Sequence, residues 1–153
     1  TIELADLGCR QLGFARPHIG VCGLNPHAGD GGLFGMEEKK VIAPAIRKAR
    51  AKGYFVEGPY SADSLWPWVG GGKFDVGVAM YHDQGQIPVK LFAFHAMKNK
   101  QTIVRGVNAT IGLPIVRTSV AHGTAYDIAG QSIASEQSML DAIRLAGVMA
   151  NNR

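Results

Sequence analysis

A histidine and an aspartate stand side by side in the polar segment 79–85 (AMYHDQG), at the end of the apolar run 76–80. The run predicts a buried strand, so His82 and Asp83 come where that strand stops. In open α/β sheets, ligands bind beyond the carboxyl ends of strands, because the sheet holds the first loop residues in place beside a cleft. His82 is therefore a candidate ligand, although a surface histidine beside a turn aspartate has the same local sequence.

A second histidine, His27, follows another apolar run, residues 19–24, and lies in the Gly-rich segment 25–35 with Asp30 nearby. Two strand ends that each carry a histidine can bring two imidazoles together in one cleft. Neutral imidazoles bind zinc and other first-row divalent cations, but a firm site needs at least three ligands. The spacing suggests that His27 and His82 are two ligands of a metal ion, and it does not identify a third ligand.

The same Gly-rich segment lacks the sequence of either common nucleotide-binding loop. Gly29 and Gly31 would need a third glycine at position 34 for the dinucleotide fingerprint, and that position is Phe34. No G-x-x-x-x-G-K-[ST] sequence occurs in the chain. A standard Rossmann loop and a P-loop are both excluded.

Three more polar residues follow or interrupt apolar stretches: Lys90, Asn108 and Arg117. A lysine point charge, an arginine fork and an orienting amide together suit a small anion. Each also has an ordinary explanation: a solvent-exposed edge lysine, a turn or cap asparagine, and an arginine in a surface ion pair. His18, beside Pro17, is interpreted as a structural residue.

Helices and strands that alternate along the chain must position these residues. Helices are predicted over residues 2–12, 36–52 and 135–150, with a short one starting at 61, and strands over 19–24, 54–57 and 75–81. Another apolar run covers 87–94, residues 107–110 and 114–116 look extended, and 122–129 is helical or turn-like. The alternation predicts an α/β layered domain.

Some details of these elements can also be predicted. Gly58 and Pro59 are expected to close the strand 54–57, and residues 66–72 to form a loose segment. Glu37 and Glu38 open the helix 36–52, where acidic side chains complement the helix dipole. The apolar face of the last helix is expected to consist of Met139, Ile143, Leu145, Ala146 and Met149.

Composition narrows the classes of protein. The 153 residues are 18% charged and 46% apolar with a net charge of +4, which fits one folded domain that could bury surface against another subunit or domain. Basic residues are not interleaved with aromatic ones, which argues against nucleic-acid binding. No apolar run approaches the ~20 residues needed to cross a bilayer, so no membrane association is expected.

Cys9 and Cys22 share no metal-type spacing, so they are interpreted as reduced packing residues of a cytoplasmic protein. The first residues lack the basic start and apolar centre of a signal peptide. Because the chain has no initiator methionine and opens within a helical pattern, it is interpreted as a piece of a longer protein.

Five ordered segments resemble one family. They are residues 23–29 (GLNPHAG), 79–85 (AMYHDQG), 106–108 (GVN), 112–114 with 117–119 (GLP and RTS), and 122–125 (HGTA). In this order they are similar to the motif series of the 4-hydroxythreonine-4-phosphate dehydrogenase family of pyridoxal phosphate biosynthesis, whose relatives act on 4-phosphoerythronate and threonate 4-phosphate. The resemblance implies an isocitrate/isopropylmalate dehydrogenase-like layered α/β fold and a homodimer. This chain would be the carboxyl-terminal portion of a two-domain protein, with the amino-terminal part absent.

By position, the resemblance implies that His27 and His82 are two of three histidine ligands of a divalent metal ion (Zn, Mg, Co or Mn). It implies that Lys90, Asn108 and Arg117 bind the phosphorylated substrate. It also implies that the adenosine end of NAD or NADP is bound by His122, Gly123, Thr124, Ala125 and Asp127. Taken alone, this segment could also be the start of a helix that binds no ligand. Enzymes of this superfamily bind the dinucleotide without a Rossmann loop, which accounts for the missing fingerprint.

The implied reaction is hydride transfer from a secondary alcohol to NAD(P)+, followed by loss of carbon dioxide from the β-keto acid. Asp83 is the candidate catalytic residue, either as proton acceptor or as hydrogen-bond partner of a ligand histidine. Because the third histidine would lie upstream, the 153 residues alone are expected to be inactive. An insertion over residues 95–105 favours a divergent member with altered substrate choice. The alternatives are a non-catalytic dimerising module of the same fold and a phosphate-ester transferase on a related fold.

Overall fold

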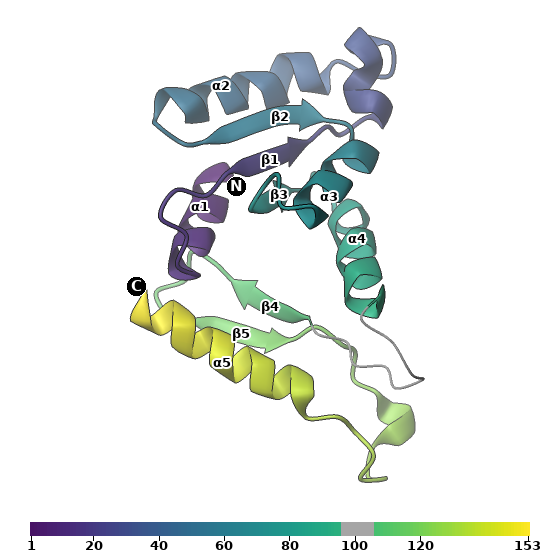
Figure 1. Ribbon diagram of the computed structural model, residues 1–153. Coiled ribbons are helices and arrows are strands. Elements are labelled where there is room, and N and C mark those ends of the chain that lie inside the picture. Colours follow the sequence, from purple (N-terminus) through teal and green to yellow (C-terminus); the bar gives the residue numbers. More distant parts are fainter. Residues whose placement is uncertain (96–105) are drawn as a thin grey trace. The chain divides into compact units, whose positions relative to one another are not determined.

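A computed structural model describes residues 1–95 and 106–153 of the chain, which form two compact units, Thr1–Pro88 and Val89–Arg153 (Figure 1). Each unit has its own sheet and its own packed helices. Most of the expected insertion, residues 96–105, lies outside the described residues. No helix in the described ranges is both long and apolar enough to cross a membrane.

The first unit is built on three parallel strands in the order β2-β1-β3. β1 (Ile19–Cys22) is central and buried along its whole length, β2 (Val56–Tyr60) pairs with one side of it, and β3 (Val76–Val78) pairs with the other. Because the strands are parallel, their carboxyl ends meet at one edge of the sheet. The segments that carry the two histidines start at this edge.

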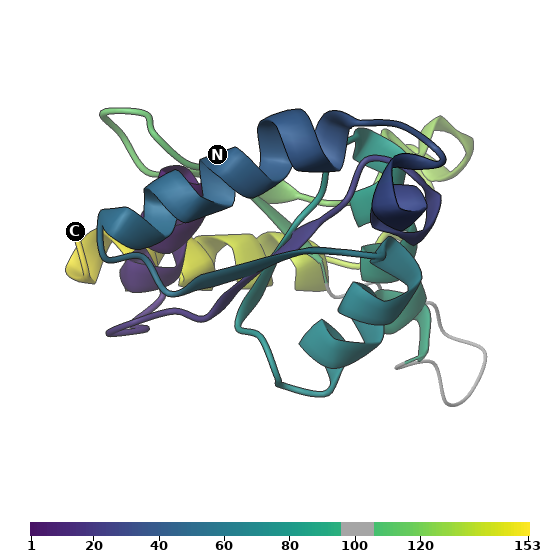
Figure 2. The same cartoon turned by 90° about the horizontal axis from the view of Figure 1, so that it is seen from above.

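Helices cover both faces of this sheet. α1 (Ile2–Gln11) and α2 (Ala43–Ala51) pack on one face, around a core that includes Ile19, Val21 and Ile46. α3 (Ala62–Gly70) packs on the other face, where Leu65 and Phe74 are buried. Figure 2 shows α2 and α3 on opposite sides of the strands. The predicted α/β layered arrangement is confirmed in this unit.

Two local expectations for this unit were wrong. β2 does not close at Gly58 and Pro59 but continues through both to Tyr60, and its pairing with β1 becomes irregular there. Proline is tolerated because β2 is an edge strand of the described sheet. Gly58 has a φ of +130°, and a Cβ on it would lie 2.5 Å from the carbonyl oxygen of Val21, so the close approach requires glycine.

The segment 66–72, expected to be loose, is helical as far as the end of α3 at Gly70. Leu65 is completely buried, and the ring of Trp66 lies against Gly77 of β3, where an added Cβ would meet it at 2.4 Å. This packing holds the helix in spite of Pro67 inside it, because burial of apolar surface outweighs a local propensity.

Several other boundaries also differ from the sequence-based ones. The helix predicted over 36–52 begins as a π-type turn, η2 (Glu38–Ile42), before it becomes α2. β3 is shorter than the predicted strand 75–81, and the apolar run 87–94 belongs to a helix, α4 (His82–His95). The Gly-rich segment contains a short helical turn, η1 (Pro26–Gly32).

The second unit contains an antiparallel pair, β4 (Val107–Thr110) and β5 (Arg117–Val120), a short turn, η3 (Tyr126–Ile128), and the final helix, α5 (Gln137–Asn151). The strand predicted at 114–116 was therefore placed too early. α5 packs on the strand pair through Ser138, Ala142 and Met149.

The expected apolar face of α5 was wrong in part, since Met139 and Ile143 are 53% and 62% exposed. The small side chain of Ala142 lets the backbone of the helix approach β5. The hydroxyl of Thr118 donates to the carbonyl oxygen of Ala142 at 2.9 Å. The rotation of the helix thus follows the close backbone contact at Ala142 and the burial of Met149, which leave Met139 and Ile143 exposed.

Candidate functional site

His27 lies in a left-handed turn just past the end of β1. Within η1, five successive residues have positive φ: His27 (53°), Ala28 (52°), Gly29 (83°), Asp30 (41°) and Gly31 (67°). This hand of helix costs about 1–2 kcal/mol for each residue other than glycine. Three of the five are not glycine, so the turn needs support from other parts of the chain. Strained backbone of this kind clusters at ligand-binding sites.

Glu38 supports the entry to this turn. Its Oε1 accepts hydrogen bonds from the backbone N–H groups of Leu24 and Asn25, both at 2.8 Å, and its Oε2 accepts one from Asn25 Nδ2 at 3.0 Å. The residue is only 4% exposed. Burial acts to raise the pKa of Glu38, but the hydrogen bonds from Asn25 and Leu24 outweigh it and hold that pKa below its usual value. The carboxylate is thus a charged, buried acceptor.

Two neighbours of Glu38 bind other parts of the same segment. Glu37 accepts a hydrogen bond from Asn25 Nδ2 at 2.7 Å, and Lys39 Nζ donates to the carbonyl oxygen of Gly31 at the exit of the turn. All three residues lie at the start of the π-type turn η2, a conformation that occurs frequently at functional sites. The interpretation of Glu38 as a helix-dipole charge was incomplete, because its carboxylate is buried against the turn of His27.

His82 and Asp83 are the first two residues of α4, a short distance past the end of β3. Both are exposed, and Asp83 sits where an acidic side chain favours the helix dipole. Gln84 anchors this helix start. Its Nε2 donates to the carbonyl oxygen of Gly23 at 2.9 Å, and its Oε1 accepts from the N–H of Met80 at 2.7 Å. Gln84 therefore joins the two strand ends that carry the histidines.

His27 and His82 thus follow adjacent parallel strands at the same edge of the sheet. Imidazoles in this position suit a first-row divalent cation, so the donor set fits part of a metal site. No group of three His, Cys, Asp or Glu residues that could hold a metal occurs in the described part of the chain. A metal bound by these two histidines needs at least one more ligand.

Asp63, at the start of α3, is a residue that the sequence did not single out. The pKa of Asp63 is lowered, chiefly by a hydrogen bond from Ser61 and in smaller part by the charge of His27. The carboxylate is exposed, and α3 lies against η1, the turn that contains His27. Only the fold brings Asp63 to this edge, so no pattern around it could have shown the proximity.

In the second unit, Asn108 and Arg117 lie on one face of the strand pair. Asn108 pairs with Ser119 and Thr110 pairs with Arg117, and paired residues of antiparallel strands share a face. Thr118, which belongs to the alternate set, contacts α5. The face with Asn108 and Arg117 is thus the one that α5 does not cover. Arg117 Nη1 donates to the hydroxyl of Thr110 at 2.9 Å, which holds the guanidinium across the strand pair.

The remaining predicted residues lie on exposed segments. Lys90 is exposed on α4. The predicted cofactor segment begins directly after β5, and His122 Nδ1 lies 2.9 Å from the carbonyl oxygen of Gly123. Ala125 has a φ of +50° and precedes η3, which contains Asp127. The roles of these residues in binding stay predictions.

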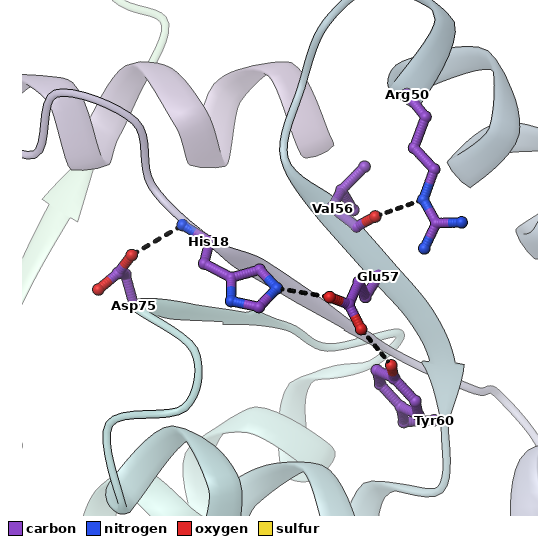
Figure 3. Close-up of polar contacts among 6 residues, drawn as sticks. All are labelled: His18, Arg50, Val56, Glu57, Tyr60 and Asp75. Atoms are coloured by element: carbon purple, nitrogen blue, oxygen red, sulfur yellow. Dashed lines mark hydrogen bonds and ion pairs between the residues drawn. The ribbon is translucent and has the colours of Figure 1, made fainter.

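His18 belongs to a separate polar cluster (Figure 3). Its Nε2 donates to Glu57 Oε1 at 2.9 Å, its backbone N–H donates to Asp75 Oδ2 at 2.7 Å, and its ring stacks on Phe55 at a centroid distance of 3.9 Å. Tyr60 donates its hydroxyl to Glu57 Oε2 at 2.6 Å. These contacts tie β1 to β2 and to the start of β3, which confirms the structural interpretation of His18.

Several known proteins are similar to this chain in sequence and in structure. A crystal structure of 4-hydroxythreonine-4-phosphate dehydrogenase from Klebsiella pneumoniae is 47% identical, with a TM-score of 0.78 over 97% of this chain and 43% of that one. D-threonate 4-phosphate dehydrogenase of Cupriavidus necator is 51% identical over the whole of this chain and 44% of its own length. 4-Hydroxythreonine-4-phosphate dehydrogenase of Beijerinckia indica is 52% identical over 95% of this chain and 41% of its own.

The parallel sheet, its covering helices and this similarity define the layered α/β fold of the isocitrate and isopropylmalate dehydrogenases. The profile of the pyridoxal phosphate biosynthetic protein PdxA matches residues 1–146. The chain belongs to the PdxA family. It spans less than half the length of these relatives.

Proposed function

We propose that the full-length protein containing this chain oxidises and decarboxylates a phosphorylated four-carbon hydroxy acid, such as 4-hydroxythreonine 4-phosphate or threonate 4-phosphate. NAD or NADP is the oxidant, and a divalent metal ion is required. The observation that carries the proposal is the pair His27 and His82 after adjacent parallel strands in a chain of the PdxA family. The names of the relatives support the substrate class.

In this reaction the C–H bond at the secondary alcohol breaks, its hydride reduces NAD(P)+, and the hydroxyl proton is released. The ketone then stands β to the carboxylate, so the bond to the carboxylate can break with release of carbon dioxide and protonation of the carbon left behind. A divalent cation, when bound, would stabilise negative charge on the substrate oxygen. This charge stabilisation is what both steps require.

Residues of this chain would bind the metal, the phosphate and the dinucleotide and accept the proton. His27 and His82 would hold the metal, and Asp83 beside His82 would accept the hydroxyl proton or orient a ligand histidine. Arg117, with Asn108 on the same strand face, presents a planar fork suited to two phosphate oxygens, and Lys90 adds a point charge. The segment His122–Asp127 would contact the dinucleotide.

The metal assignment is tested on full-length protein by measuring bound metal and NAD(P)+ reduction. His27→Ala and His82→Ala should each lose metal and activity, and chelation of the unaltered protein should remove activity. His18→Gln is the matched control, because His18 is held by Glu57 and Asp75 and should keep its metal. Unchanged metal content in both His27→Ala and His82→Ala would disprove the assignment.

The phosphate assignment is tested with Arg117→Lys, which keeps the charge but removes the fork. The KM for the phosphorylated substrate should rise about tenfold or more, corresponding to one lost charge-assisted hydrogen bond of about 1.5–3 kcal/mol. Arg144→Lys is the control, since Arg144 is exposed on α5 and its Nη1 lies 3.4 Å from Asp141 Oδ1. An equal KM in Arg117→Lys and in unaltered protein would argue against the assignment.

The choice of substrate and the homodimer can each be tested on the full-length protein. Comparison of kcat/KM for 4-hydroxythreonine 4-phosphate and for threonate 4-phosphate decides between the two substrates. Light scattering of the full-length protein tests the proposed homodimer. A protein that dimerises but binds no dinucleotide would instead be the non-catalytic module considered from the sequence.

A further inference from the structure

The turn of His27 is a short 3-10 type helix with backbone hydrogen bonds of its own, but three of its residues adopt positive φ without being glycine. Phe34 donates its backbone N–H to the carbonyl oxygen of Gly29, and Leu33 donates to that of Asp30, both at 3.2 Å. Asn25 precedes the turn but does not cap it, because its side chain donates to Glu37 and Glu38 instead. Contacts from outside the turn therefore contribute to the conformation of His27.

Glu38 is the buried group that does this. It fixes the backbone of Leu24 and Asn25 immediately before the turn, and both of its oxygens are in use. The carboxylate also lies against two glycines of the segment. A Cβ on Gly29 would lie 2.6 Å from Glu38 Oε2, and one on Gly23 would lie 3.0 Å from Oε1. The path of the chain before and within the turn is thus shaped around this side chain.

The same path also leads to the second histidine. Gly23 donates its N–H to Tyr60 of β2 and accepts from Gln84 of α4, so it is held independently of Glu38. Loss of the Glu38 carboxylate would free Leu24, Asn25 and the turn, while Gln84 would continue to hold the start of α4 and His82. The two histidines therefore differ in their dependence on Glu38.

We propose that Glu38 is a positioning residue for the metal site, acting on His27 and not on His82. The inference rests on the proposed role of His27 as a metal ligand. Glu38 contributes by holding the imidazole of His27 in the direction that a cation needs. Partners that orient a ligand in this way commonly change metal affinity 10–100-fold when they are altered.

The test measures Co²⁺ affinity of the full-length protein by calorimetry, with Co²⁺ alone as the probe. Glu38→Gln keeps the shape of the side chain and removes its charge. It should weaken Co²⁺ binding about tenfold or more and alter the ligand-field absorption of the bound ion. Glu37→Gln is the matched control, because Glu37 is exposed and its bond to Asn25 reaches the side chain and not the backbone before the turn, so its change should stay within about twofold.

A double-mutant cycle shows whether Glu38 acts through His27. In a His27→Gln background, Glu38→Gln should cause almost no further loss of Co²⁺ affinity, whereas in a His82→Gln background it should cause its full loss. Equal losses in both backgrounds would mean that Glu38 supports the whole strand edge, and no loss in the unaltered background would mean that it supports neither. Either result overturns the proposal.

Other outcomes separate this proposal from the one it rests on. If the unaltered protein does not bind Co²⁺, or if His27→Gln binds it as tightly, the metal assignment itself fails and the positioning role fails with it. If Glu38→Gln does not fold, Glu38→Asp takes its place in the cycle, because the shorter side chain keeps the charge and withdraws the carboxylate from the backbone of Leu24 and Asn25. A Co²⁺ affinity unchanged by Glu38→Asp would then overturn the proposal.

Discussion

Gln84 bonds to backbone groups on two segments that are far apart in the sequence. It is 9% exposed, and it accepts from Met80 and donates to Gly23. We expect Gln84→Leu to lower the free energy of unfolding of the full-length protein by about 2–4 kcal/mol, because it leaves the half-buried N–H of Met80 and the buried carbonyl of Gly23 without these partners. Urea denaturation measures the change.

Gln86→Leu is the control for this prediction, since Gln86 lies on the same helix and is half-buried. Its effect should stay within about 0.5 kcal/mol. Similar values for the two variants would show that the bonds of Gln84 contribute little.

Glu57 gives a prediction for pH dependence. A hydrogen bond from Tyr60 and another from His18 hold the pKa of Glu57 below its usual 4.5. A carboxyl with a lowered pKa in the folded state contributes stability that is complete above the unfolded value and is lost as the pH falls through the folded value. The stability difference between unaltered protein and Glu57→Gln should therefore be largest above pH 4.5 and shrink below it.

Urea denaturation of both proteins at several pH values measures this difference in the free energy of unfolding. Arg50, Tyr60 and His18 lie beside Glu57 and are unchanged in both proteins (Figure 3). A difference that stays constant from neutral pH to about pH 3 would contradict the prediction.

At the scale of single residues, the sequence located His27 and His82 because each follows an apolar run and is accompanied by an acidic residue. It did not predict the contacts of Glu38 and Gln84 or the position of Asp63. The partners of Glu38 and Gln84 are backbone groups in other segments, and a backbone group carries no mark in the sequence. Such hydrogen bonds become visible only when the strands are placed side by side.

At the scale of elements, apolar periodicity predicted α1, β1 and α5 closely, because each has a continuous pattern and clear ends. It failed where tertiary packing decides. α3 is helical through Pro67 because of Trp66 and Leu65, and β2 passes through Pro59 because it lies at the edge of the described sheet. The left-handed turn η1 was also beyond prediction, since His27, Ala28 and Asp30 all disfavour positive φ.

That turn provides a prediction at the same scale. Gly31 has a φ of +67° with no atom near an added Cβ, whereas Gly29 has a φ of +83° and an added Cβ would lie 2.6 Å from Glu38 Oε2. Gly31→Ala should cost about 1–2 kcal/mol of unfolding free energy from backbone strain alone. Gly29→Ala should cost about 1–3 kcal/mol more, because the carboxylate of Glu38 must move.

Urea denaturation of full-length protein without metal compares the two variants, and Gly31→Ala serves as the control for backbone strain. Equal costs would mean that Glu38 moves aside freely, which would also weaken the inference that it holds the turn. A lower Co²⁺ affinity in Gly29→Ala than in Gly31→Ala would agree with that inference from a second position.

At the scale of the whole molecule, the two units hold different parts of the proposed chemistry. The first carries His27 and His82, and the second carries Asn108, Arg117 and the predicted cofactor segment. The chain covers 44% of the length of a relative to which it is 51% identical. The first unit also has a hollow of about 470 Å³ lined largely by apolar side chains, among them Val41, Ile42 and Val78.

The 153 residues expressed alone should therefore bind an apolar fluorescent dye strongly and show no NAD(P)+ reduction with either phosphorylated acid. The full-length protein should bind the dye weakly and reduce NAD(P)+. The dye follows from the apolar hollow and from exposed side chains such as Leu33 and Ile143. The missing turnover follows from the proposed metal site, because the described residues offer no group of three ligands and two imidazoles alone hold a divalent cation weakly. Turnover by the isolated chain, sensitive to a chelator and to His82→Ala, would contradict this and would mean that the 153 residues complete the metal site themselves.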